Sequence, residues 1–128
     1  MAAMSNYLEN ALINEVLRAT GYTAPTTVYV ALFTSDPTDA GSGTECSGTS
    51  YARQSATFAA PSNGASSTSA DINFPQAGGS WGTITHFGIF DALTSGNLLV
   101  HGALTTSKTI DTGDVFKIAS GSLTVTFA

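Results

Sequence analysis

Apolar and polar residues follow strand-like patterns along much of the chain, and the densest apolar stretch lies at residues 81–104 (WGTITHFGIFDALTSGNLLVHGAL). A Thr-Ser-Gly-Asn segment at residues 94–97 divides this stretch near its middle. Both halves have the length of strands, and the dividing residues tolerate the positive φ of tight turns. The pattern therefore predicts a long central β-hairpin.

A helical pattern occupies residues 5–20. Its apolar side chains recur every three or four residues and form one stripe: Leu8, Leu12, Ile13, Val16 and Leu17. We expect Asn6 to cap this helix, with Glu9 three positions later completing a capping box, and Gly21 to end it. The helix is expected to pack on the sheet or to dock on a neighbouring subunit.

Period-two alternation indicates further strands on both sides of the hairpin. These strands are expected at residues 27–34, 51–59, 70–74, 108–110, 115–118 and 123–127. Gly- and Ser-rich loops at residues 35–50 and 61–69 separate some of them, and no second helical segment intervenes. Residues 1–128 are therefore predicted to form a single mainly β domain with one N-terminal α-helix. After the helix, residues 27–128 are expected to form an antiparallel β-sandwich (jelly-roll-like) or a small barrel of about eight strands.

Only 10% of the 128 residues are charged, and the net charge is −5 with four lysines and arginines in total. Binding to phosphates requires clustered basic residues, so neither nucleic acid nor an anionic membrane is an expected partner. Low charge is also a property of surfaces buried at interfaces, which predicts a homo-oligomer. The alternative is a stable monomer whose faces are covered by Ser and Thr.

The sequence contains one cysteine, Cys46, which excludes an internal disulfide framework and a site with several cysteine ligands. The N-terminus lacks the basic segment and apolar core of a secretory signal peptide. No apolar run approaches the roughly 20 residues that a transmembrane helix needs. We therefore expect neither secretion nor membrane insertion.

Several residues are candidates for chemistry, but each has a simpler interpretation. His86 and His101 lie on the two arms of the hairpin and could be cross-strand neighbours, but a metal site needs further ligands. Asp91 is expected on the opposite side of its strand, away from them. Cys46 has no neighbouring base, and no serine lies in a nucleophile elbow. Structural roles are favoured for all of these residues.

The loops and aromatic residues give equally weak indications of a site. The first long loop contains three acidic residues, Asp36, Asp39 and Glu45. Their spacing is not that of an EF-hand calcium-binding loop. Asp111 and Asp114 flank a turn, and no glycine-rich segment has the pattern of a phosphate-binding loop. Trp81 and the tyrosines could form a sugar-binding surface, although core packing accounts for them. We expect no catalytic, cofactor-binding or metal-binding residue, and no enzymatic activity.

Five segments together resemble a family of small structural proteins of tailed bacteriophages, whose members are often labelled tail fibre or virion proteins. They are YVALFTSDPTDAGSGTE, SYARQ, WGTITHFGIFDA, GNLLVHGAL and TIDTGDVFKI, beginning at residues 29, 50, 81, 96 and 109. The resemblance begins at the helical segment SNYLENALINEVL and extends over nearly the whole chain. It implies a virion protein that is assembled in the cytoplasm of the bacterial host.

Two roles are compatible with the resemblance. The first is a capsid decoration or cement protein that binds and stabilises the head shell, with the major capsid protein as its partner. The second is a tail or tail-fibre-associated component involved in host attachment, with tail proteins as partners. Decoration is favoured for two reasons. At 128 residues the chain is small for a fibre. It also has no shaft repeats or coiled-coil heptads. In either case, contacts are expected through the N-terminal helix and the polar loops flanking residues 51–59.

Overall fold

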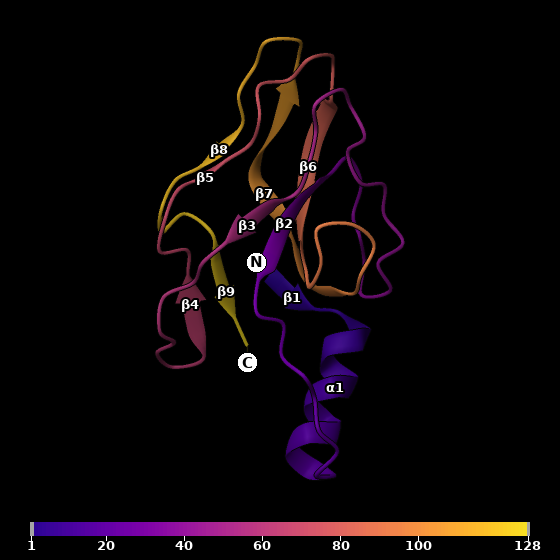
Figure 1. The fold of residues 1–128 in the computed structure, drawn as a ribbon, viewed down its shortest axis with the longest axis vertical. Coiled ribbons are helices and arrows are strands. Elements are labelled where there is room, and N and C mark those ends of the chain that lie inside the picture. Colours follow the sequence, from indigo (N-terminus) through magenta and orange to yellow (C-terminus); the bar gives the residue numbers. More distant parts are fainter. Residues whose placement is uncertain (1, 128) are drawn as a thin grey trace.

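The computed structural model describes residues 2–127 and contains one helix and nine strands within that range (Figure 1). The elements in order are β1 (Ala2–Met4), α1 (Asn6–Leu17), β2 (Val28–Phe33), β3 (Gln54–Ala56), β4 (Ala65–Ser67), β5 (Ile72–Asn73), β6 (Gly82–Phe90), β7 (Leu98–Ile110), β8 (Lys117–Ile118) and β9 (Thr124–Thr126).

Five strands form the main antiparallel sheet, in the order β1-β7-β6-β2-β3. Its register pairs Val30 with Ile89 and Gly88 with His101, so the central hairpin predicted from the sequence is confirmed. Along β2, Val30 and Leu32 point to the main core, while Ala31 and Phe33 join a second apolar cluster. The sheet is therefore covered on both faces, as the apolar run in β2 predicts.

Two short antiparallel ladders, β4–β9 and β5–β8, form a second layer beside the main sheet (Figure 1). The main core lies between the layers and includes Trp81, Ile84 and Phe116. The edges of the main sheet, β1 and β3, do not pair with each other. The prediction of a mainly β, antiparallel sandwich with one N-terminal helix is confirmed, and the fold is not a closed barrel.

The opposite face of the sheet is covered by the loop at residues 35–45. Pro37 is fully buried, and Phe33 forms a β-bridge with Glu45. The second apolar cluster lies beneath this loop and contains Ala31, Phe33, Phe90 and Leu98. Gly88 provides the necessary space, because a Cβ atom there would lie 2.9 Å from side-chain atoms of both Phe33 and Leu98.

Several predicted boundaries are wrong. The strands expected at residues 98–104 and 108–110 are one continuous strand, because β6 pairs with β7 as far as Ile110. The strand expected at residues 51–59 is reduced to β3. Two strands were not foreseen: β1, which precedes the helix, and β4, which lies in the expected loop at residues 61–69. Both unforeseen strands form through long-range pairing, with β7 and β9 respectively.

The helix ends also differ from the prediction. Ser5, not Asn6, is the N-cap: its hydroxyl accepts a hydrogen bond from the Leu8 amide at 3.2 Å and donates to the Leu98 carbonyl. At the other end, the helix stops at Leu17, and Ala19 rather than Gly21 has the left-handed conformation, with φ of 52°. A buried cap that bonds to β7 thus determines where the helix starts.

Candidate interaction surface

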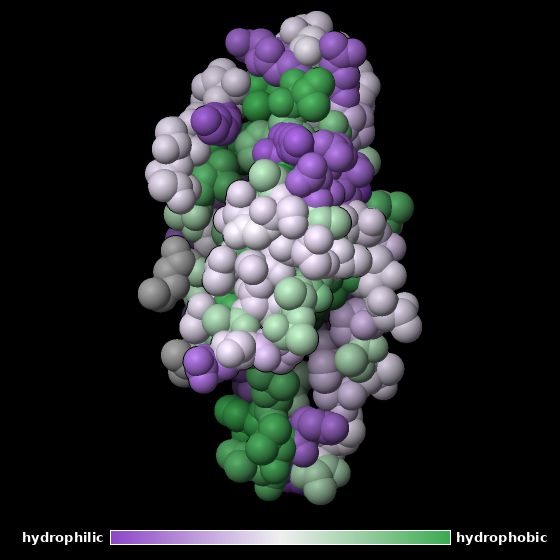
Figure 2. Space-filling view, turned by 90° about the vertical axis from the view of Figure 1, so that its left-hand side faces the viewer, coloured by the Kyte–Doolittle hydropathy of each residue, from purple (hydrophilic) through white to green (hydrophobic). Residues whose placement is uncertain are grey.

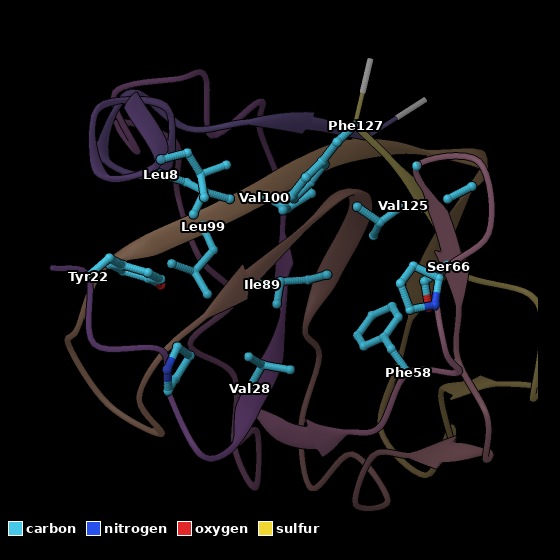
Figure 3. A pocket seen from close by; sticks show the side chains of 15 residues that line it. Leu8, Tyr22, Val28, Phe58, Ser66, Ile89, Leu99, Val100, Val125 and Phe127 are labelled. Carbon is cyan, nitrogen blue, oxygen red and sulfur yellow. The ribbon is translucent and has the colours of Figure 1, made fainter. Parts of the chain in front are cut away.

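An apolar groove of about 390 Å³ lies between α1, the main sheet and the β4–β9 ladder. Figure 3 shows side chains from all three parts pointing into one space. The lining consists of Leu8, Leu12, Tyr22, Pro25, Val28, Phe58, Pro61, Gly64, Ala65, Ser66, Ile89, Leu99, Val100, Val125 and Phe127. None of these residues is charged. Burial raises the pKa of the Tyr22 hydroxyl above its usual range, so this side chain stays neutral in the groove.

The apolar side chains at the far end of α1 are exposed. Leu8 alone is buried among the helix residues, all of which the structure describes, whereas Ile13, Val16 and Leu17 are 51%, 73% and 76% exposed. The helix extends past the sheet, as Figure 1 shows, and Figure 2 shows hydrophobic surface gathered at that end of the molecule. The row that begins with Leu8 and Leu12 in the groove continues to Val16, so apolar side chains extend along this side of the helix beyond the groove.

A buried polar cluster around Arg53 lies away from this surface. The guanidinium donates to both carboxylate oxygens of Glu45, at 2.9 and 2.8 Å, and to the carbonyls of Ala92 and Ser95. Its central carbon lies 3.7 Å from the centre of the Phe90 ring. Each of the three guanidinium nitrogens donates to a neighbouring loop, so Arg53 ties these loops to the sheet. Nothing in the sequence pattern around Arg53 indicates this role.

Tyr51 extends the same cluster into the main core. Its hydroxyl donates to Glu45 at 2.7 Å and accepts from the Leu32 amide at 3.0 Å. Burial, followed by the Glu45 hydrogen bond, raises the pKa of Tyr51 far above its usual range, so the group stays protonated at all physiological pH values. It is therefore a structural hydroxyl rather than an acid–base group.

The two histidines are diagonal neighbours on one face of the hairpin, since His86 pairs with Ala103 and His101 pairs with Gly88. Their rings have separate partners. His101 lies 2.8 Å from Asp39 through Nε2, and His86 lies 2.8 Å from the Thr85 hydroxyl through Nδ1. Within residues 2–127, no group of three His, Cys, Asp or Glu side chains has the geometry of a metal site.

The carboxylates singled out in the sequence are dispersed. Asp36 and Asp39 lie near His101, whereas Glu45 binds Arg53. Asp91 accepts from the backbone and side chain of Asn97, and thereby closes the hairpin loop. Asp114 accepts a hydrogen bond from the Asp111 amide at 2.9 Å. This contact agrees with the prediction that the two residues flank a turn.

Cys46 and Trp81 are core residues. Cys46 is a buried free thiol, and burial raises its pKa, which disfavours the nucleophilic thiolate. Trp81 is buried, donates its indole N–H to the Thr49 carbonyl at 2.8 Å and meets the Tyr51 ring edge-on. These contacts place Trp81 in the core rather than on a sugar-binding surface.

The uncharged groove and the exposed apolar side chains at the end of α1 are thus features suited to recognition. Their chemistry is that of contact with another apolar surface. The helix was expected to be a contact element, but the groove was not predicted, because its walls come from segments far apart in sequence. No helix in residues 2–127 is long and apolar enough to span a membrane.

Comparison with known proteins gives one family match. A family model described as "Podophage GP4 fiber I protein gp80" matches residues 3–126, which is almost the entire chain. No curated protein matches the chain.

Proposed function

The chain belongs to the podophage GP4 fiber I protein gp80 family, and on this basis we propose that it is a subunit of the tail fibre or of its attachment to the tail. Membership implies a component of the phage virion. The observation that carries the finer proposal is the extent of the match, which includes the helix and all but the outermost residues of the β-domain.

The family description favours the fibre over the head shell. Size and the lack of shaft repeats made capsid decoration the first expectation, but the matched family is described as a fibre protein. A short chain can serve a fibre as one module among several, for which shaft repeats are unnecessary. We therefore propose tail proteins, and not the major capsid protein, as its neighbours.

We propose that the subunit acts through protein–protein contacts and has no enzymatic activity. The uncharged groove and the exposed side chains of α1 support this, because apolar surface of this kind marks interaction sites. The candidate polar residues also support it, since their side chains bind other parts of the same chain. Two of the four basic residues, Arg53 and Lys117, pair with carboxylates, which leaves little positive charge for nucleic acid or membranes.

Labelling of intact virions tests this proposal. Antibodies against the purified protein, detected with gold particles in electron micrographs, are expected to mark the tail or its fibres. Virions of a phage with the gene deleted are the matched control and should carry no label. Label on the head shell would contradict the fibre proposal and revive capsid decoration.

A further inference from the structure

The C-terminal half of β7 forms an open edge of the main sheet. β1 pairs with β7 only from Val100 to Gly102, and within residues 2–127 no other strand occupies that side of β7. Among the described residues, no backbone hydrogen bond outside the ladders involves residues 104–109. The backbone groups of this segment that point away from β6 are therefore available to a further strand.

Pairing with β6 is also interrupted within this segment. Lys108 pairs with Ile84 and Ala103 pairs with His86, so residues 104–107 form a bulge opposite a single position of β6. A bulge leaves backbone groups without ladder partners and bends the strand. The backbone of residues 104–107 is consequently more accessible than that of a regular edge strand.

A groove of about 430 Å³ lies beside this open edge. β8 lies across the groove from β7 and pairs with β5 instead, so the second layer does not close the edge (Figure 1). The lining includes the buried core residues Phe87, Phe116 and Leu123. A groove of this kind can receive the side chains of an added strand while the backbone of that strand pairs with the edge.

The charged side chains among the described residues that line the groove are both basic. They are Lys108 and Lys117, which are two of the four basic residues in a chain of net charge −5. Lys108 forms no ion pair within the part of the chain that the structure describes. Lys117 pairs with Asp71 at 3.3 Å, but its side chain remains 52% exposed. The groove is thus a local concentration of positive charge on an acidic molecule.

From these observations we propose that the open edge of β7 binds an extended acidic segment of a neighbouring protein by strand addition. The backbone of the segment pairs with residues 104–109, and its carboxylates meet Lys108 and Lys117. A segment of about six residues suffices, because this is the usual length of a strand. The surface is separate from the apolar groove beside α1, and the inference does not depend on the fibre assignment.

The charge at this edge selects among possible partners. A lysine on an edge strand disfavours pairing with a neutral apolar strand or a basic one, whereas an acidic strand gains an opposite charge. A second copy that pairs edge to edge is disfavoured, because β7 itself contains no acidic residue and would place lysines near one another. The acidic strand is therefore the partner that fits.

Peptide binding to the purified full chain tests the proposal. The probe is a fluorescent peptide of alternating valine and glutamate, and the matched control peptide alternates valine and lysine. Fluorescence anisotropy should show saturable binding of the glutamate peptide that weakens with added salt, and no binding of the lysine peptide. Absence of binding by the glutamate peptide, or equal binding of both peptides, would overturn the proposal.

Two variants with the same change of charge locate the site. Lys108→Glu should weaken binding of the glutamate peptide at least about tenfold, since it places like charges together at the edge. Arg18→Glu, at an exposed position on α1, should leave the affinity unchanged. Circular dichroism and thermal unfolding check that both variants fold. Equal losses of affinity would assign the effect to net charge and contradict the proposed site.

Hydrogen exchange of the wild-type chain distinguishes strand addition from simple charge attraction. Saturation with the glutamate peptide should slow exchange of the backbone amides of residues 104–109 and leave those of α1 unchanged. Binding without this protection would overturn strand addition. Neither measurement uses the virion, so label on the head shell would remove the fibre assignment and leave this inference standing.

Discussion

At the scale of single residues, Arg53 contributes more to the structure than its place in a polar segment suggests. It connects Glu45, the loop after β6 and the Phe90 ring, and its side chain is 8% exposed. A buried guanidinium is stable only when its nitrogens have hydrogen-bond acceptors. All three nitrogens donate to Glu45, Ala92 or Ser95, so the loop that holds Glu45 and the loop after β6 depend on one side chain.

Replacement of this side chain should destabilise the protein markedly. We expect Arg53→Ala to lower the free energy of unfolding by about 3 kcal/mol, because Glu45 would lose its charge partner in a partly buried site. Chemical denaturation followed by circular dichroism measures the change. Lys117→Ala is the matched control: its ion pair with Asp71 is exposed on both sides, so the expected loss is below about 1 kcal/mol. If both variants lost the same free energy of unfolding, Arg53 would not stabilise the loops in the proposed way.

At the scale of elements, the start of α1 depends on a contact that the sequence does not reveal. Asn6 and Glu9 have the spacing of a capping box, so the local pattern points to Asn6. In the structure Ser5 takes the cap position, because β1 pairs with β7 and the Ser5 amide binds the Leu99 carbonyl at 2.9 Å. A long-range pairing thus overrides the local signal.

Two substitutions distinguish these caps. Ser5→Ala should lower the free energy of unfolding by about 1–2 kcal/mol, since it removes the bond from the Leu8 amide and leaves the buried Leu98 carbonyl without its donor. Asn6→Ala should have little effect. Thermal unfolding of both variants provides the measurement, and a larger effect at Asn6 would support the sequence-based prediction instead.

Sequence patterns predicted the strands in which burial is periodic, but they did not predict strands that form by pairing with segments far away in the sequence. β2 and the β6–β7 hairpin were predicted because their apolar residues alternate or run continuously. The join between residues 104 and 108 was missed because Thr105, Thr106 and Ser107 are polar and all three are exposed, so this part of β7 has no apolar face and no alternating pattern. The groove and the Arg53 cluster could not be predicted, because their members come from separate loops and carry no shared periodicity.

At the scale of the whole molecule, one core includes residues from α1 and from strands of both layers. We expect residues 1–128 to unfold as one cooperative unit. Calorimetry should give a single transition with an enthalpy of about 90 kcal/mol near 60 °C, from about 0.7 kcal/mol per residue. The calorimetric and van't Hoff enthalpies should agree at a concentration where the chain is monomeric. Two separate transitions would contradict a single domain.

The length of β7 has a mechanical consequence. This 13-residue strand runs beside β6 along the long axis of the molecule, and α1 joins the sheet at one end of that axis through β1 (Figure 1). A load pulling α1 away from the opposite end is directed along the strands, so the hydrogen bonds of the β1–β7 and β6–β7 ladders bear it together. A subunit built in this way resists stretching along its own long axis.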